Sequence, residues 1–454
     1  MQENRSGDPS EASRRNAAIG WLVVGLLAVL ATVHALESSY RWFVFTGLAI
    51  VIVLLPAAAR RNPFAMPSWE LLVLVAIPVV DATVLEETFL TSIATYVAVA
   101  AVALVAVAEI DRFTAVRMTH TFATALVVLT TLAVAATWNV VLWLSDVMLE
   151  TSYILTGRSE DAANHAMMMD FVYAAVAGLL AGVLFNRYPV QASPLSGDGD
   201  SSGAPDDRSS PGRDEEPDST PSLIRGRFDV PERTVRSVAW LLQAALVAVL
   251  LYGLFARDVT TIANAGIALA ITTLPAILER NYRTPLEPEL VVWITGAVLL
   301  HALGSAGLYG LLGQWDSLTH ALSASIVAGT GYAVVRAIDL HTDSVYLPNR
   351  MLFVFILIFV LAFGVVWELM EFALGLVGGW SGYEVILAQH GITDTVGDLF
   401  YDLVGAVLVA AWGWVYLTDV SYRLADRLES GARGGKRNDD RTDRNCPAVS
   451  RRLI

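Results

Sequence analysis

Apolar residues occur along this chain in runs of about 20, enough for a helix that rises 1.5 Å per residue to cross a hydrocarbon core of roughly 30 Å. Within lipid, backbone polar groups must be paired internally, which leaves helices or closed barrels as spanning structures. Runs of this length indicate helices. The pattern therefore predicts an all-α polytopic membrane protein.

We expect about twelve spans in two sets of six. The first set lies near 17–36, 41–59, 69–85, 89–110, 122–146 and 170–187. The second set lies near 235–256, 259–279, 289–312, 317–338, 351–376 and 398–417. The first run has small residues near a possible cleavage position, but it is long for a signal peptide and an equivalent run recurs later, so we interpret it as a span.

Polar segments divide the chain into five parts. Residues 1–16 form an N-terminal tail, and residues 17–187 and 235–417 form two membrane repeats. Residues 190–232 are rich in Pro, Gly, Ser and Asp, so they are predicted to be a disordered acidic linker. Residues 421–454 are similar in composition and are predicted to be a disordered tail.

The two repeats resemble each other in sequence. "LLPAAARRN" ending at Asn62 matches "TLPAILERN" ending at Asn281, and "DFVYAAVAG" from Asp170 matches "DLFYDLVGA" from Asp398. Two degenerate copies of a six-helix unit explain both matches, with the first copy the more degenerate. Because six is even, the two copies are expected to insert the same way round.

Arginine is distributed unevenly between alternate connections. One side carries Arg60, Arg61, Arg112, Arg117, Arg187, Arg280, Arg283, Arg336 and Arg350. The other side carries only Arg41, Arg158 and Arg257. The arginine-rich side is predicted to be cytoplasmic, which places both termini and the linker inside a cell with the protein in its plasma membrane.

Composition narrows the possible partners. The chain of 454 residues is 55% hydrophobic and 16% charged, and its net charge of −14 argues against nucleic acid as a partner. Excess acid with a single lysine, Lys436, is typical of salt-adapted proteins. The one cysteine, Cys446, lies in the polar tail, so no disulfide framework or cysteine metal site is expected.

The second repeat carries ionisable residues at the extracytoplasmic ends of three predicted helices. "WDSLTHA" places Asp316 and His320 one turn apart, and "WELMEF" places Glu368 and Glu371 three residues apart on one helix face. Residues 391–408 add a stripe of aspartates at every fourth position: Asp394, Asp398 and Asp402.

Insertion cost decides how these residues are interpreted. A charged side chain near the bilayer centre costs on the order of 2.5–3.5 kcal/mol, so the acids are expected to face the protein interior and to pair, bind a cation or share protons. Structural roles remain open for five residues. Asp316 and Asp394 could cap helices, His320 and His301 could be packed core histidines, and His390 could be a solvated loop residue.

The first repeat lacks most of this cluster. Only Asp170 persists there, matching Asp398. The other matched positions are Thr88, Ser92, Asn139, Leu142 and Ala174. Residues required for folding alone would be expected in both copies. We therefore interpret the cluster as a chemically active site and the first repeat as a scaffold. A different site built from Glu86, Glu87 and Asp146 stays open.

The motifs "WDSLTHA", "WELMEF" and "DTVGDLFYDLVGAVL" resemble those of the uncharacterised YjdF-type membrane proteins and, more distantly, of VanZ-like proteins associated with glycopeptide resistance. The resemblance is strong over residues 255–417 and weak over residues 17–187. It implies a compact helical membrane unit in which all seven acidic and histidine positions of the cluster are motif positions, and it assigns no reaction.

The leading functional hypothesis is metal-assisted chemistry on a lipid or lipid-linked headgroup at the outer face. The hypothesis gives catalytic roles to His320, Asp316, Glu368 and Glu371, with His320 as an acid or base oriented by Asp316. It gives metal-ligand roles to Glu371, Asp394, Asp398 and Asp402. Oxygen ligands favour Mg²⁺, Mn²⁺ or Ca²⁺ as the cation.

Two alternatives remain open at this stage. A non-catalytic module could hold a lipid or a cation for another membrane protein. A cation- or proton-coupled transporter would suit two parallel repeats of six helices, but the acids lie in one repeat and toward one face, whereas a transport path needs ionisable groups near the midplane.

Overall fold

The computed structural model describes residues 11–37, 39–84, 89–114, 116–154, 157–187, 231–282, 288–341, 345–381, 389 and 391–411. The predicted linker at 190–232 lies almost wholly outside these ranges. The predicted C-terminal tail, residues 1–10 and His390 lie outside them as well.

Most of the described residues are helical, and no strand occurs among them. The first helices are α1 (Glu11–Leu36), α2 (Tyr40–Ala59), α3 (Trp69–Val84), α4 (Phe89–Phe113), α5 (His120–Leu149) and α6 (Glu160–Arg187). After the linker come α8 (Glu232–Ala256), α9 (Val259–Tyr282), α10 (Pro288–Leu303), the π-helix η1 (Gly304–Leu308), α11 (Tyr309–Leu311), α12 (Trp315–His341) and α13 (Asn349–Ser381). A final helix covers residues 392–411.

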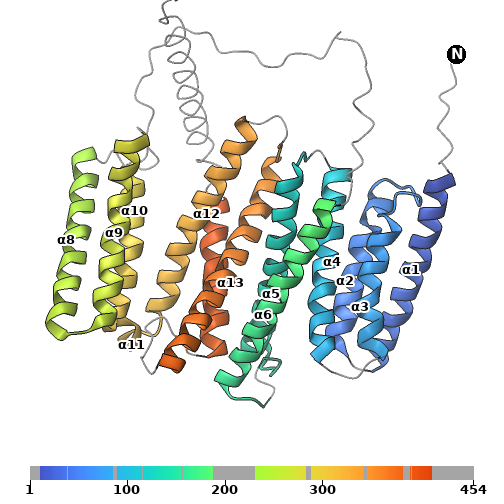
Figure 1. The fold of residues 1–454 in the computed structure, drawn as a ribbon, viewed down its shortest axis with the longest axis horizontal. Coiled ribbons are helices and arrows are strands. Elements are labelled where there is room, and N and C mark those ends of the chain that lie inside the picture. Colours follow the sequence, from blue (N-terminus) through green and yellow to red (C-terminus); the bar gives the residue numbers. More distant parts are fainter. Residues whose placement is uncertain are drawn as a thin grey trace, which may run out of the picture. The chain divides into compact units, whose positions relative to one another are not determined.

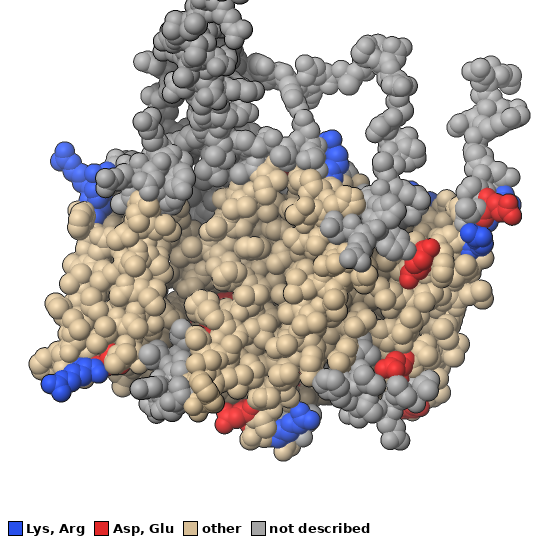
Figure 2. All heavy atoms as spheres, in the orientation of Figure 1, with Lys and Arg blue, Asp and Glu red and all other residues tan. Residues whose placement is uncertain are grey.

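The helices confirm a multi-pass helical membrane protein. Within the described ranges, eight helices are long and apolar enough to cross a membrane, and two shorter apolar helices cover Thr95–Ile110 and Val259–Pro275. On the face shown in Figure 2, the acidic and basic side chains lie mainly near the ends of the helices, and uncharged residues cover the lengths between. Twelve spans and a duplicated unit stay predictions.

The chain packs as two compact units. Unit 1 comprises Met1–Thr234 and Ile358–Leu403, and unit 2 comprises Val235–Leu357 and Val404–Ile454. The helices α13 and 392–411 each have residues in both units. Most of α13 therefore packs with helices of the first predicted set, although its sequence belongs to the second.

Unit 1 has two apolar clusters. One joins α1, α2, α3 and α4 around Leu27, Val53 and Leu72, which are almost fully buried. The other joins α5 and α6, side by side in Figure 1, to α13 and the helix over 392–411. Phe171 and Leu399, both fully buried, lie in this second cluster. It positions the acidic residues described below.

Unit 2 is held by apolar contacts among α8, α9 and α10, with Leu246, Ala265 and Leu299 at the centre. The last helix approaches α12 closely, since a Cβ added to Gly405 would lie 2.2 Å from the backbone oxygen of Ala321. Small residues permit such close contacts between helices. In lipid, where the hydrophobic effect does not drive helices together, this close packing holds them instead.

The short connection between α8 and α9 is stabilised by Asp258. Its carboxylate accepts hydrogen bonds from the backbone N–H of Thr260 at 3.0 Å and from the hydroxyl of Thr261 at 2.6 Å. The first contact caps α9. The hydrogen bond from the Thr261 side chain lowers the pKa of Asp258, against the smaller opposing effect of burial.

Asp258→Ala should therefore destabilise the protein by about 1 kcal/mol, the usual cost of losing a helix cap. Because the folded-state pKa is lowered, the stability that Asp258 contributes is present above the unfolded pKa of about 3.9 and is lost as the pH falls through the folded value. Thermal unfolding in detergent at several pH values measures both effects. Asp258→Asn, which keeps a capping oxygen, is the control, and equal melting temperatures for wild type and Asp258→Ala near neutral pH would contradict the assignment.

Candidate functional site

In unit 1, Glu368 is an acidic residue buried inside a membrane-spanning helix. Its side chain is only 1% exposed, and it lies roughly 20 Å from the end of α13 at Ser381, at 1.5 Å per residue. A buried carboxylate needs partners that donate hydrogen bonds, because its desolvation is costly. The position therefore requires dedicated polar contacts.

A chain of two amides supplies such contacts to Glu368. Gln389 Nε2 donates to Glu368 Oε2 at 2.7 Å and to the Glu368 backbone oxygen at 3.0 Å. Gln389 Oε1 in turn accepts a hydrogen bond from Asn164 Nδ2 at 2.8 Å. Asn164 lies on α6 and is also buried. A residue of the first predicted set of helices thus contributes to the surroundings of Glu368.

The helix over residues 392–411 begins beside α6. The carboxylate of Glu160 accepts from the Thr393 backbone N–H at 3.0 Å and from the Thr393 hydroxyl at 2.9 Å. Gly391 precedes the helix with a φ of +104°, and a Cβ there would lie 2.9 Å from Glu160 Cβ. A glycine is required for this turn, and Glu160 acts as an external cap for the helix.

The three aspartates of this helix differ in depth. Asp394 lies in the first turn and is half-buried, whereas Asp398 and Asp402 are 7% and 8% exposed. Asp402 packs against α13, where a Cβ added to Gly364 would lie 2.7 Å from Asp402 Oδ2. Gly364 is one turn before Glu368, so the helix presents Asp402 to the same stretch of α13 that carries Glu368.

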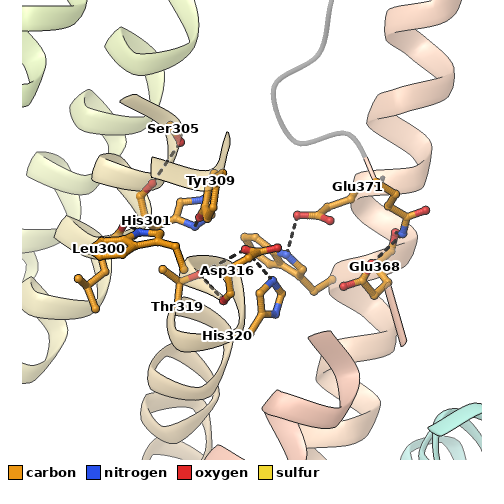
Figure 3. A network of polar contacts seen from close by, with 12 residues as sticks. Leu300, His301, Ser305, Tyr309, Asp316, Thr319, His320, Glu368 and Glu371 are labelled. Atoms are coloured by element: carbon orange, nitrogen blue, oxygen red, sulfur yellow. Dashed lines mark hydrogen bonds and ion pairs between the residues drawn. The ribbon is translucent and has the colours of Figure 1, made fainter. Parts of the chain in front are cut away.

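Glu371 lies one turn after Trp367, whose indole Nε1 donates to Glu371 Oε1 at 2.9 Å. Figure 3 shows Glu368 and Glu371 on α13. The next residue, Phe372, makes an edge contact with the ring of His165 on α6, with centroids 5.3 Å apart. Unit 1 therefore gathers polar and aromatic side chains from α6, α13 and the helix over 392–411.

Unit 2 contains a polar group of side chains at a distorted helix end. The π-helix η1 includes Gly307, which has a φ of +125°. The turn folds Tyr309 back over Gly304, where an added Cβ would lie 2.3 Å from the ring, and the Tyr309 hydroxyl reaches His301 Nδ1 at 2.7 Å. π-Helical turns occur frequently at functional sites.

Asp316 and His320 lie at the start of α12, beside His301 and Tyr309 (Figure 3). Asp316 Oδ1 is 3.8 Å from His320 Nε2. Asp316 lies within the first turn of α12 rather than before it, and its Oδ1 also accepts from the Thr319 hydroxyl at 3.3 Å. This arrangement favours the predicted pairing of Asp316 with His320 over a capping role.

The predicted site residues divide between the two units by their place in the chain. Glu368, Glu371, Asp394, Asp398 and Asp402 belong to unit 1, and Asp316 and His320 belong to unit 2. His301, which the sequence left open as a packed histidine, bonds to Tyr309.

Sequence reasoning missed Asn164, Gln389, Tyr309 and Glu160. Asn164 and Gln389 are uncharged and follow no helical period with the acids, so only their position beside the site identifies them. The contact between Tyr309 and His301 depends on the distorted turn of η1, which a regular helical period does not predict. Glu160 reads in the sequence as an ordinary acidic residue in the first turn of α6.

Carboxylate oxygens are the available ligands for a metal in unit 1. Asp398 and Asp402 come from one helix and Glu371 from another. Hard divalent cations take several oxygen ligands. Amide oxygens are also ligands for such cations. Carboxylate and amide oxygens suit a hard divalent cation better than zinc.

Comparisons with known proteins agree with the membrane assignment. Residues 238–419 match a family described as "Predicted membrane protein (DUF2238)", a region from α8 to the helix over 392–411. Residues 10–66 match a family described as "Domain of unknown function (DUF8268)". Searches of curated proteins and of solved structures each found no match. The C-terminal set of helices is therefore similar to a family of predicted membrane proteins.

Glu160→Ala should loosen the start of the helix over 392–411 by about 1–2 kcal/mol, because the Thr393 N–H loses its acceptor. Amide hydrogen exchange at residues 393–396 should quicken by about 5- to 30-fold if opening is local. The matched control is Asp161→Ala, which removes an exposed carboxylate from the same turn of α6. Equal exchange in the two variants would show that Glu160 does not cap this helix.

Proposed function

We propose that this integral membrane protein binds a divalent cation through its intramembrane carboxylates and uses it for metal-assisted chemistry on a lipid or lipid-linked headgroup. One observation carries the proposal: Glu368 is more than nine-tenths buried within a helix long and apolar enough to span a membrane, and Asp398 and Asp402 are as deeply buried in the helix over 392–411. Intramembrane ionisable residues are costly and mark functional sites by default.

The cation site is proposed to use the carboxylates of Glu371, Asp398 and Asp402, with Asp394 nearer the start of its helix. Mg²⁺, Mn²⁺ and Ca²⁺ are the candidates, because every proposed ligand atom is oxygen. A cation would balance several negative charges that otherwise repel one another. Glu368, held by Gln389, would act as a carboxylate that orients a substrate or accepts a proton.

The headgroup assignment rests on the orientation that the arginine pattern predicts. In that orientation the carboxylates lie on the extracytoplasmic half of their helices, and they descend from the interface toward the outer-leaflet core. A headgroup bearing phosphate would bind through the cation rather than directly to carboxylates.

An acid–base role is proposed for His320, with Asp316 as its partner in unit 2 at 3.8 Å. A neighbouring carboxylate orients an imidazole and stabilises its protonated form during proton transfer. The His301–Tyr309 hydrogen bond gives the same group of side chains a second proton donor or acceptor.

Purified wild-type protein should bind about one Mn²⁺ per chain, as measured by elemental analysis and by electron paramagnetic resonance titration in nanodiscs. Asp398→Asn and Asp402→Asn should each weaken binding by at least about 10- to 100-fold, the range seen even for residues that only support metal ligands. The control is Glu70→Gln, which removes an exposed carboxylate from α3. Mn²⁺ binding that survives in both aspartate variants would overturn the cation assignment.

His320→Gln should leave Mn²⁺ binding unchanged while lowering turnover of lipid headgroup substrates by about 10²- to 10⁴-fold, the usual contribution of a general acid or base. The assay is mass spectrometry of membrane lipids incubated with wild-type or variant protein and Mn²⁺. Cation binding without turnover in the wild type would instead identify a lipid- or cation-binding module. Equal turnover in His320→Gln and wild type would remove the acid–base role.

A further inference from the structure

The two amides beside Glu368 can be arranged in only one direction. The Glu368 backbone oxygen and ionised Oε2 are both acceptors, so Gln389 must turn its Nε2 group toward them. Its Oε1 then faces Asn164, which must donate through Nδ2. The orientation of each amide thus follows from the acceptors that it faces. The Glu368 backbone oxygen accepts in either state of the side chain, and Oε2 accepts a stronger hydrogen bond when Glu368 is ionised.

We infer that Asn164 and Gln389 are positioning residues that hold Glu368 ionised and fixed in orientation. The inference deepens the proposed function, on which its consequence for cation binding rests. Hydrogen bonds donated to a carboxylate favour its charged form. Asn164 supplies the second link: with its Nδ2 bonded to Gln389 Oε1, rotation of the Gln389 amide by half a turn would break that bond and present an oxygen to Glu368.

The groups around Glu368 oppose its negative charge. Titratable groups on the packed helices include His165 and Asp170 on α6, Glu371 on α13, and Asp394, Asp398 and Asp402 on the helix over 392–411. All of these except His165 are carboxylates, and each one that is ionised opposes a further negative charge nearby. Burial opposes the charge on Glu368 as well. The hydrogen bond that Gln389 donates therefore favours the charged form of Glu368.

The chain of hydrogen bonds from Asn164 through Gln389 to Glu368, called the relay below, also gives α6 a specific role. Asn164 Oδ1 is buried without a hydrogen-bond partner among the described residues, which is the cost of directing Nδ2 toward Gln389. An asparagine placed only for packing would satisfy its own atoms more simply. Asn139 on α5 does so, because its Nδ2 donates to the backbone oxygen of Ala135 one turn earlier.

Infrared spectroscopy of protein labelled with ¹³C-glutamate reports the charge of Glu368 directly. The carbonyl stretch of a protonated carboxyl is distinct from the stretches of a carboxylate, and a band that disappears in Glu368→Gln belongs to Glu368. The wild type should show no protonated band of this kind. Gln389→Met, nearly the same size but without donors, should show one at close to full intensity, and Asn164→Ala should show one at intermediate intensity.

Asn139→Ala is the matched control and should keep the wild-type spectrum. Gel filtration identifies variants that do not fold. If Gln389→Met does not fold, the protonated Glu368 band in Asn164→Ala is the test of the inference. A protonated Glu368 in the wild type, or wild-type spectra for the folded Gln389 and Asn164 variants, would overturn the inference.

The cation assay separates this result from the proposed function. Mn²⁺ affinity should fall by about 10- to 100-fold in Gln389→Met, as expected when the support of a charged site is lost. If the wild type binds no Mn²⁺ but the infrared bands change as described, the cation proposal fails and the relay stands. If Mn²⁺ binds and the bands do not change, the relay fails and the cation proposal stands.

Discussion

The cost of keeping carboxylates inside a membrane protein governs the arrangement of unit 1. A charged group at the centre of a spanning helix costs on the order of 2.5–3.5 kcal/mol unless a partner compensates it. Glu368, Asp398 and Asp402 are all buried, so the cost recurs at three positions. A fold that carries it must supply donors, protons or a cation at each position, and the amide of Gln389 is the compensation that is visible at Glu368.

Close helix packing is the second part of the same arrangement. Gly364 leaves room for Asp402 against α13, and Gly391 allows the chain to turn against Glu160 before the last helix begins. A side chain at either glycine would push the acidic helix away from its neighbours. The glycines therefore position the acids as directly as the hydrogen bonds do, because a donor contributes only when it lies within hydrogen-bond distance of its acceptor.

The sequence predicted the features that repeat along a helix. Apolar runs predicted the spanning helices, and the spacing of Asp394, Asp398 and Asp402 predicted a single helix that carries all three. Contacts between distant parts of the chain leave no such period. Asn164 and Gln389 are 225 residues apart, and nothing in either local sequence marks the pair. The π-helix at Gly304–Leu308 likewise arises from a turn geometry that apolar periodicity does not encode.

The acidic cluster is present in the second predicted repeat and mostly absent from the first, and the packing of the helices suggests a reason for this difference. The first repeat has Asn139 where the second has Glu368, and its loss of acidic positions suggested a scaffold without chemistry. Yet α6 provides the donor Asn164 to the chain that ends at Glu368 and the carboxylate of Glu160 to the start of the aspartate-bearing helix. If the repeats did arise by duplication, one copy kept the charges while the other came to supply their supports. Loss of the acids in one copy is then a division of roles, because a donor amide beside a buried carboxylate lowers the cost of its charge whereas another carboxylate would raise it.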